Sequence, residues 1–99
     1  MEFFRREGEL FIRLNGDFNY PAVKRIEQLL RSEEIDSFTI DLSGAKVVDS
    51  EAVKFLFFLD RDNIAVRVVN PPYIFDKILD ILKLKDRFKN LTVVKEGQR

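Results

Sequence analysis

The fold is decided by residues 38–59, which read FTIDLSGAKVVDSEAVKFLFFL. Apolar and polar side chains alternate over 38–42, which is the pattern of a strand within a sheet. A turn at 43–45 follows, and residues 47–48 carry the chain back toward the sheet. A helix is predicted from about Ser50 to Asp60, because apolar side chains then recur at helical spacing. A strand, a short crossing segment and a helix in this order indicate an α/β domain.

The remaining sequence continues this alternation of strands and helices. We predict strands at 2–6, 9–14, 35–42, 64–69 and 91–94, one helix opened by Asn19-Tyr20-Pro21 that ends at 32–34, and another helix at 73–82. Right-handed crossovers then join parallel strands, and a hairpin around Glu7-Gly8 adds an antiparallel edge. The result is a single α/β domain over residues 1–99, with a mixed, mostly parallel sheet, an antiparallel N-terminal edge and about three main helices. Residues 96–99 are expected to fray.

Burial can also be predicted from the pattern. The strand at 64–69, IAVRVV, is apolar enough to be buried on most of both faces, as parallel strands commonly are. Because the sequence has ten Phe and no Trp, Phe is expected to supply much of the core volume. The apolar set of the helix at 73–82 consists of Ile74, Phe75, Ile78, Ile81 and Leu82.

Composition excludes several classes of function. Seventeen basic and seventeen acidic residues cancel, so no net charge draws the chain to nucleic acid or to an anionic membrane. The sequence contains no Cys and no His, which removes thiolate metal sites, a Cys nucleophile and the commonest general base. No apolar run has membrane-spanning length and the N-terminus lacks a signal-peptide pattern, so we expect a cytoplasmic protein without direct membrane insertion. We expect no cofactor and no metal.

Three aspartates are candidates for a carboxylate cluster. Asp17, Asp41 and Asp49 are the residue type that holds a metal ion or performs acid–base chemistry. Each also has a simpler explanation, since Asp17 lies in a turn, Asp41 lies at the end of a strand and Asp49 caps a helix. With no His or Cys to join them, we favour the simpler explanation and predict that the chain is not an enzyme.

Asp49 and Ser50 stand at the entrance of the helix at 50–60, and they have two interpretations. An Asp or Ser at this place is commonly a cap, which stabilises a helix by roughly 1 kcal/mol. A Ser at a helix entrance can also be a switch, because a phosphate attached there lies on the helix dipole and beside free backbone N–H groups.

The same helix carries more apolar surface than one core contact requires. Val53 and Phe57 lie roughly 60–100° round the helix from the arc that should face the sheet. Either these two side chains are buried beneath the loop at 43–48 or against the third helix, or they form an exposed patch beside Ser50 where a partner docks. The arc expected to face the sheet consists of Ala52, Phe55, Leu56 and Leu59.

Five short segments follow one another in a recognisable order. They are GDFN at 16–19, IDLSG at 40–44, VDS at 48–50, VVNP at 68–71 and LKLKDRF at 82–88. Together they resemble the STAS domain, which is found in anti-sigma factor antagonists and in sulphate transporters. The resemblance covers almost the whole chain and implies a STAS-type fold.

The resemblance also implies a function. In antagonists of this family, the Ser directly after the Asp is phosphorylated by a partner that is both anti-sigma factor and kinase. The unphosphorylated form captures that partner and so frees the sigma factor. Ser50 occupies this position, Asp49 would orient it, and Val53 with Phe57 would form the docking surface. The chain would then be a regulatory module that binds an anti-sigma factor or a related Ser/Thr kinase-like protein.

Three positions, Glu51 and Ala52 after Ser50 and Asn19 before the first helix, differ from the family pattern. Glu51-Ala52 stands where the family has Ser or Thr and then Gly, so a fixed negative charge flanks Ser50. Asn19 stands where the family often has an Asp near the phosphosite. Glu51 agrees equally well with an alternative, a STAS accessory subunit of a cytoplasmic transport complex that binds a transporter ATPase or permease without phosphorylation. A small-ligand or nucleotide sensor is a third alternative, for which the sequence specifies no pocket.

Overall fold

The computed structural model describes residues 1–31 and 34–96. The predicted helix end at 32–34 and the predicted fraying of 96–99 therefore lie mostly outside the described residues. Within the described part, the strands are β1 (Glu2–Arg6), β2 (Glu9–Arg13), β3 (Ser37–Asp41), β4 (Ala65–Val69) and β5 (Leu91–Val94), and the helices are α1 (Tyr20–Leu30), α2 (Ser50–Arg61) and α3 (Tyr73–Ile81). The predicted order of strands and helices is confirmed.

The five strands form one mixed sheet in the order β1-β2-β3-β4-β5. Strand β1 pairs antiparallel with β2, and every later pairing is parallel, which confirms the predicted fold class. A tight turn joins β1 to β2, in which Gly8 adopts the positive φ of 68° that a glycine accepts without strain. Since each strand lies beside its predecessor, the sheet grows in one direction only.

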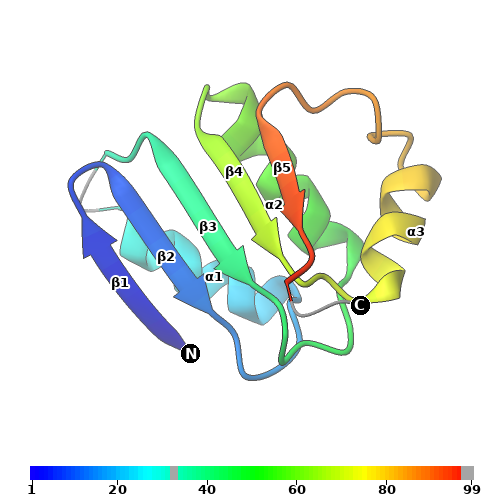
Figure 1. Cartoon of the computed structure of the whole chain (residues 1–99), viewed down its shortest axis with the longest axis horizontal. Helices are drawn as coiled ribbons and strands as arrows, with labels where there is room; N and C mark the ends of the chain where they lie inside the picture. Colours follow the sequence, from blue (N-terminus) through cyan, green and yellow to red (C-terminus); the bar gives the residue numbers. More distant parts are fainter. Residues whose placement is uncertain (32–33, 97–99) are drawn as a thin grey trace.

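The direction of growth decides where the helices lie. When parallel strands are added in one direction through crossovers of one hand, every crossover passes the same face of the sheet. Helices α1 and α2 accordingly lie behind the sheet in Figure 1, and α3 lies beyond the β5 edge. Within the described residues, no helix or strand covers the opposite face. We call this the open face.

The core lies between the sheet and the helices. The side chains of Leu10, Ile12, Phe38, Ile40 and Val68 are 0% exposed and alternate along β2, β3 and β4 toward the helices. The rings of Phe38 and Phe55 meet edge to face, with 6.0 Å between their centroids. Four phenylalanines are buried, as expected for a core without Trp, and these are Phe18, Phe38, Phe55 and Phe75.

Two predictions of side-chain burial are wrong, because β4 and α3 are each covered on fewer sides than expected. Ala65 and Arg67 of β4 are exposed, because their side chains point to the open face. Ile81, predicted to be in the apolar set of the third helix, is 73% exposed, and Leu79 is buried instead. Helix α3 lies at the edge of the sheet, where fewer of its sides meet the core.

Asp60 joins the last turn of α2 to the segment that leads into β5. Its side chain is 2% exposed, and its two carboxylate oxygens accept hydrogen bonds from the backbone N–H groups of Lys89 (2.9 Å) and Asn90 (2.6 Å). A buried carboxylate is tolerated when such charge-assisted bonds replace its water. Asp60 was expected only as the end of the helix at 50–60, and no pattern in the sequence predicts this contact.

Gly44 allows the loop before α2 to approach the loop after β2. A Cβ atom at Gly44 would lie 2.9 Å from the backbone oxygen of Leu14 and 3.4 Å from Cα of Asn15. A methyl group at this distance from backbone atoms forces one of the two loops to move. These loops carry the entrances of α1 and α2, so Gly44 contributes to their relative placement.

We therefore predict that Gly44→Ala lowers the free energy of unfolding by about 1–2 kcal/mol, the usual cost of overpacking. Gly16→Ala is the matched control, because nothing lies within 4 Å of a Cβ atom at Gly16. Urea unfolding followed by circular dichroism measures both values. Equal stability of the two variants would contradict the proposed close approach.

Candidate functional site

The entrances of α1 and α2 lie side by side. An isolated parallel bridge joins Phe18 to Val48, the residues that lead into the two helices. The backbone N–H of Phe18 donates to the Val47 oxygen (2.9 Å), and the N–H of Asp49 donates to the Phe18 oxygen (3.1 Å). Phe18 is 0% exposed and Val48 is 2% exposed, so buried apolar contact reinforces the bridge. Two helix N-termini, each with a partial positive charge, are thereby brought together.

Asp49 serves both helix entrances with one carboxylate. It is the N-cap of α2, as predicted, and its Oδ1 accepts a hydrogen bond from the N–H of Ala52 (2.9 Å). Its Oδ2 accepts a second hydrogen bond from the N–H of Tyr20, the first residue of α1 (3.1 Å). Asn19 caps α1 through Oδ1, which accepts from the N–H of Ala22 (3.2 Å). Asn19 and Asp49 stand at the helix starts predicted from the sequence, whereas the bond from Asp49 to α1 is a tertiary contact that local pattern does not predict.

Ser50 is the first residue of α2, and its side chain is exposed. Its neighbour Glu51 is also exposed and forms an ion pair with Lys54, one turn along the helix (3.6 Å). Both partners of this pair are half-exposed, so it contributes little to stability. Ser50 is therefore accessible to solvent, and the charged residues next to it along the chain and one turn up the helix include Asp49, Glu51 and Lys54.

The predicted docking pair is not exposed as expected. Val53 is 0% exposed and belongs to the same core as Phe75 and Leu79 of α3, so it cannot contact a partner in this structure. Phe57 is half-buried and packs edge to face on Phe88, with 5.3 Å between ring centroids. Of the two alternatives drawn from the sequence, burial is therefore confirmed for Val53, and the exposed docking patch is wrong for this residue. Helix α3 and the segment at 82–90 add a second contact surface to α2, beyond the sheet.

Other apolar side chains are exposed near Ser50. Tyr20 and Val47 flank the entrance of α2 and are each 49% exposed, and Phe58 is 56% exposed. Phe58 follows Ser50 by eight residues, about 12 Å along the helix axis. By helical spacing, Phe58 falls on the other side of the sheet-facing arc from Val53 and Phe57, which is a usable signal of its exposure. Tyr20 and Val47 gave no such signal, because neither lies on a periodic apolar face.

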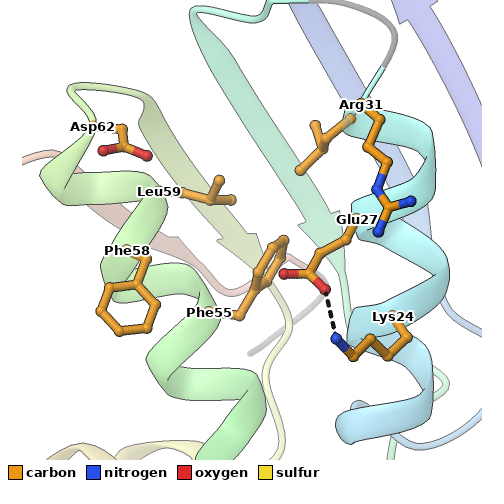
Figure 2. Close-up of a pocket in the computed structure, with 8 residues that line it drawn as sticks. Lys24, Glu27, Arg31, Phe55, Phe58, Leu59 and Asp62 are labelled. Atoms are coloured by element: carbon orange, nitrogen blue, oxygen red, sulfur yellow. Dashed lines mark ion pairs between the residues drawn. The ribbon is translucent and has the colours of Figure 1, made fainter.

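A groove runs between α1 and α2. It encloses about 470 Å³, and Figure 2 shows Phe55 and Leu59 pointing from α2 toward α1, whereas Phe58 turns away from α1. Lys24 and Glu27 of α1 form an ion pair on the opposite wall (3.6 Å). Two basic and two acidic side chains surround an apolar floor, so the charged side chains that line the groove cancel. The lining residues are Lys24, Glu27, Leu30, Arg31, Phe55, Phe58, Leu59 and Asp62.

The three candidate aspartates do not form a cluster. Asp17 is exposed, Asp49 caps the helices, and Asp41 accepts hydrogen bonds from the Ser43 backbone (2.9 Å) and hydroxyl (2.6 Å). Among residues 1–31 and 34–96, no group of three or more Asp, Glu, His or Cys side chains is placed to hold a metal ion. In the same part of the chain, no helix is both long and apolar enough to cross a membrane.

Asp41 belongs to a polar network at the carboxyl ends of the parallel strands. Arg13 donates to Asp41 through Nε (3.3 Å), and Asn70 donates through Nδ2 to the Ser43 hydroxyl (2.9 Å). Burial alone raises the pKa of Asp41, but the hydrogen bonds from Ser43 and the charge of Arg13 outweigh burial, so the pKa lies below the ordinary 3.8. The network thus stabilises the ionised carboxylate and holds the loop after β3.

Comparison with known proteins adds no assignment. No family model matches this sequence, and no curated protein matches it. The function therefore has to be argued from the residues and their geometry.

The double cap predicts that Asp49→Ala lowers the free energy of unfolding by about 2 kcal/mol, because the N–H groups of Tyr20 and Ala52 both lose their acceptor. Asn19→Ala removes a single cap bond and should cost about 1 kcal/mol. Urea unfolding of both variants measures the difference. A cost for Asp49→Ala no larger than that for Asn19→Ala would show that the bond to α1 contributes nothing.

The lowered pKa of Asp41 predicts a pH-dependent effect of Asp41→Asn. A group whose pKa is lower in the folded state stabilises the fold above its unfolded pKa, and this contribution disappears as the pH falls through the folded value. The wild type should therefore exceed Asp41→Asn in stability by about 1 kcal/mol above about pH 5, and the difference should shrink below it.

Urea midpoints across the acid range measure this difference. Ser43→Ala removes the hydroxyl donor and should reduce the pH dependence of the wild-type protein, which makes it the matched control. A difference that stays constant down to the lowest pH would exclude the proposed role of the ionised Asp41.

Proposed function

We propose that this chain is a non-enzymatic regulatory module that binds a protein partner and is switched by phosphorylation of Ser50. The observation that carries the proposal is the exposed Ser50 hydroxyl at a place where two helix N-termini meet. The resemblance of five segments to the STAS domain supports the same reading and suggests the partner, an anti-sigma factor that is also a Ser/Thr kinase-like protein. Such a partner would act on the module in the cytoplasm.

A phosphate on Ser50 would change the charge of this surface more than its shape. It adds about −1.5 to −2 charges near neutral pH. Asp49 and Glu51 already contribute negative charge there, and Lys54 is the cation one turn away. The first-turn N–H groups of α2 that Asp49 does not use would favour the phosphate. The fold can therefore remain intact while a partner that approaches this surface is repelled by the added charge.

The docking surface that we propose replaces the one predicted from the sequence. Tyr20 and Val47 flank Ser50, and the groove between α1 and α2 extends away from it with Phe58 at its rim. Exposed aromatic side chains next to an apolar groove are typical of the residues that dominate binding energy at interfaces. A partner segment seated in the groove would bring its surface against Ser50.

One observation favours an alternative function. Glu51 already places a negative charge beside Ser50 and is paired with Lys54, so an added phosphate would meet a like charge whose nearby cation is already engaged. A STAS-like accessory subunit would use the same surface to bind a transporter ATPase or permease, with no phosphorylation. The identity of the partner distinguishes the two functions.

We predict that a kinase-active lysate of the source cells, supplied with labelled ATP, modifies wild-type protein at Ser50 and leaves Ser50→Ala unlabelled. Ser43→Ala is the matched control and should be labelled like the wild type, because the Ser43 hydroxyl is engaged with Asp41 and Asn70. Mass spectrometry of the labelled peptide identifies the modified residue.

Equal labelling of the wild type and Ser50→Ala would contradict the assignment of Ser50. Recovery of a transporter ATPase or permease as the partner, together with an unlabelled Ser50, would favour the alternative function. Phosphorylation of Ser50 with unchanged partner binding would contradict the switch but not the site.

A further inference from the structure

The outer edge of β1 has the features of a strand that pairs with another chain. β1 ends the strand order, and within the described residues its only strand partner is β2. Its five residues pair with β2 in an unbroken register from Glu2–Arg13 to Arg6–Glu9, so no bulge distorts the strand. It contains no Pro, and Phe3 and Phe4 are 45% and 66% exposed. Proteins that keep a sheet edge unpaired usually protect it with Pro, bulges, very short strands or charged side chains, and of these β1 has the charges of Glu2, Arg5 and Arg6.

The charges of β1 match a second copy of the same strand in antiparallel orientation. The strand reads EFFRR, with an acid at its start and bases at its end. If two copies pair about a twofold axis at Phe4, Glu2 of each copy lies opposite Arg6 of the other. Phe4 then lies opposite Phe4, on the open face of both sheets. Opposite charges and aromatic side chains that face each other directly stabilise antiparallel strands.

The charges within each copy continue this pattern across the open face. Arg13 forms ion pairs with Glu2 (3.7 Å) and with Asp41 (3.3 Å), and Arg6 lies opposite Glu9 in the β1–β2 register. In the paired copies the charges therefore alternate in sign along one row across the open face. The row runs from Asp41, Arg13 and Glu2 of one copy to Arg6 and Glu9 of the second copy. No like charges meet at the junction.

The aromatic side chains form a second continuous row. The Phe4 ring contacts the Phe11 ring, with 5.7 Å between centroids, and both lie on the open face. The pairing would place Phe4 of one copy beside Phe4 of the other, with a Phe11 outside each. The exposed surface of Phe4, the larger of the two exposed apolar surfaces on β1, would then be covered.

Other pairings of this edge are less favourable. A parallel pair of β1 strands in register would place Glu2 on Glu2 and Arg6 on Arg6, and like charges directly opposite are destabilising. Pairing with the other sheet edge, β5, would meet the uncharged sequence LTVV and form no ion pairs. That heterologous contact would also leave a free edge on each copy and build rings or filaments in place of a dimer.

We propose that two copies of this chain associate through β1, in antiparallel orientation about a twofold axis at Phe4, to form one continuous sheet with five strands from each copy. This interface involves a different surface from the entrance of α2 and does not depend on the proposed role of Ser50. The open faces of the two sheets become one surface, with both helix layers on the opposite side.

Charge exchange at the two ends of β1 tests the proposal. Sedimentation equilibrium of the full chain over a range of concentrations should show a monomer–dimer equilibrium. Glu2→Arg and Arg6→Glu should each weaken dimerisation by about tenfold or more, because each creates two like-charge pairs at the junction. An equimolar mixture of the two variants should recover the dimer, because both junction pairs are then opposite in charge. Glu2→Arg also removes the Glu2–Arg13 ion pair within its own copy, and mixing does not restore that pair. Recovery of the dimer on mixing therefore reports on the junction between the copies.

Phe4→Lys and Phe58→Lys provide a matched comparison, since both replace a largely exposed Phe and only Phe4 lies at the proposed interface. Phe4→Lys should abolish the dimer, and Phe58→Lys should leave it unchanged. Amide hydrogen exchange of wild-type β1 should slow as the protein concentration rises, which tests the interface even if a variant does not fold. A monomeric wild type at all concentrations, a mixture that does not recover the dimer, or growth into larger assemblies would overturn the proposal.

Discussion

The order of the strands is the constraint on which the other features depend. Because the sheet grows from β1 to β5 without reversal, its crossovers share one face and its other face stays open. A sheet without reversal also lacks the crevice in which open α/β proteins commonly bind small ligands. Surfaces for contact with other molecules are therefore found elsewhere, at helix entrances, between helices and at the sheet edge.

The two helix entrances depend in turn on a single carboxylate. Asp49 neutralises part of the positive end of both α1 and α2 and so fixes the surface from which Ser50 projects. Because the cap is formed by Asp49, the Ser50 hydroxyl is not needed for capping and stays accessible. The division of these two tasks between adjacent residues allows a helix start to be both stable and available for modification. Further along the same two helices, the groove between α1 and α2 adds a hollow whose floor is apolar.

Local features of the fold could be predicted from the sequence, because short-range chemistry determines them. The alternation in β3, the caps Asn19 and Asp49 and the stop at Asn70-Pro71 each depend on a few neighbouring residues. Burial could not be predicted in the same way, since it depends on what covers a side chain. Val53 was placed correctly round α2 but proved buried, because α3 and the segment at 82–90 cover that flank. Thr39 is buried on the open face between Phe11 and Arg67, which no periodicity reveals.

Asp60 links the formation of β5 to that of α2. Its carboxylate accepts hydrogen bonds from Lys89 and Asn90 only when the last turn of α2 has placed it in the interior. The contact joins residues about thirty positions apart, so closing it costs chain entropy that local contacts must first offset. We expect the C-terminal strand to dock late in folding, together with or after the final turn of α2. Through this one buried side chain, the addition of the last strand to the sheet depends on the earlier formation of α2.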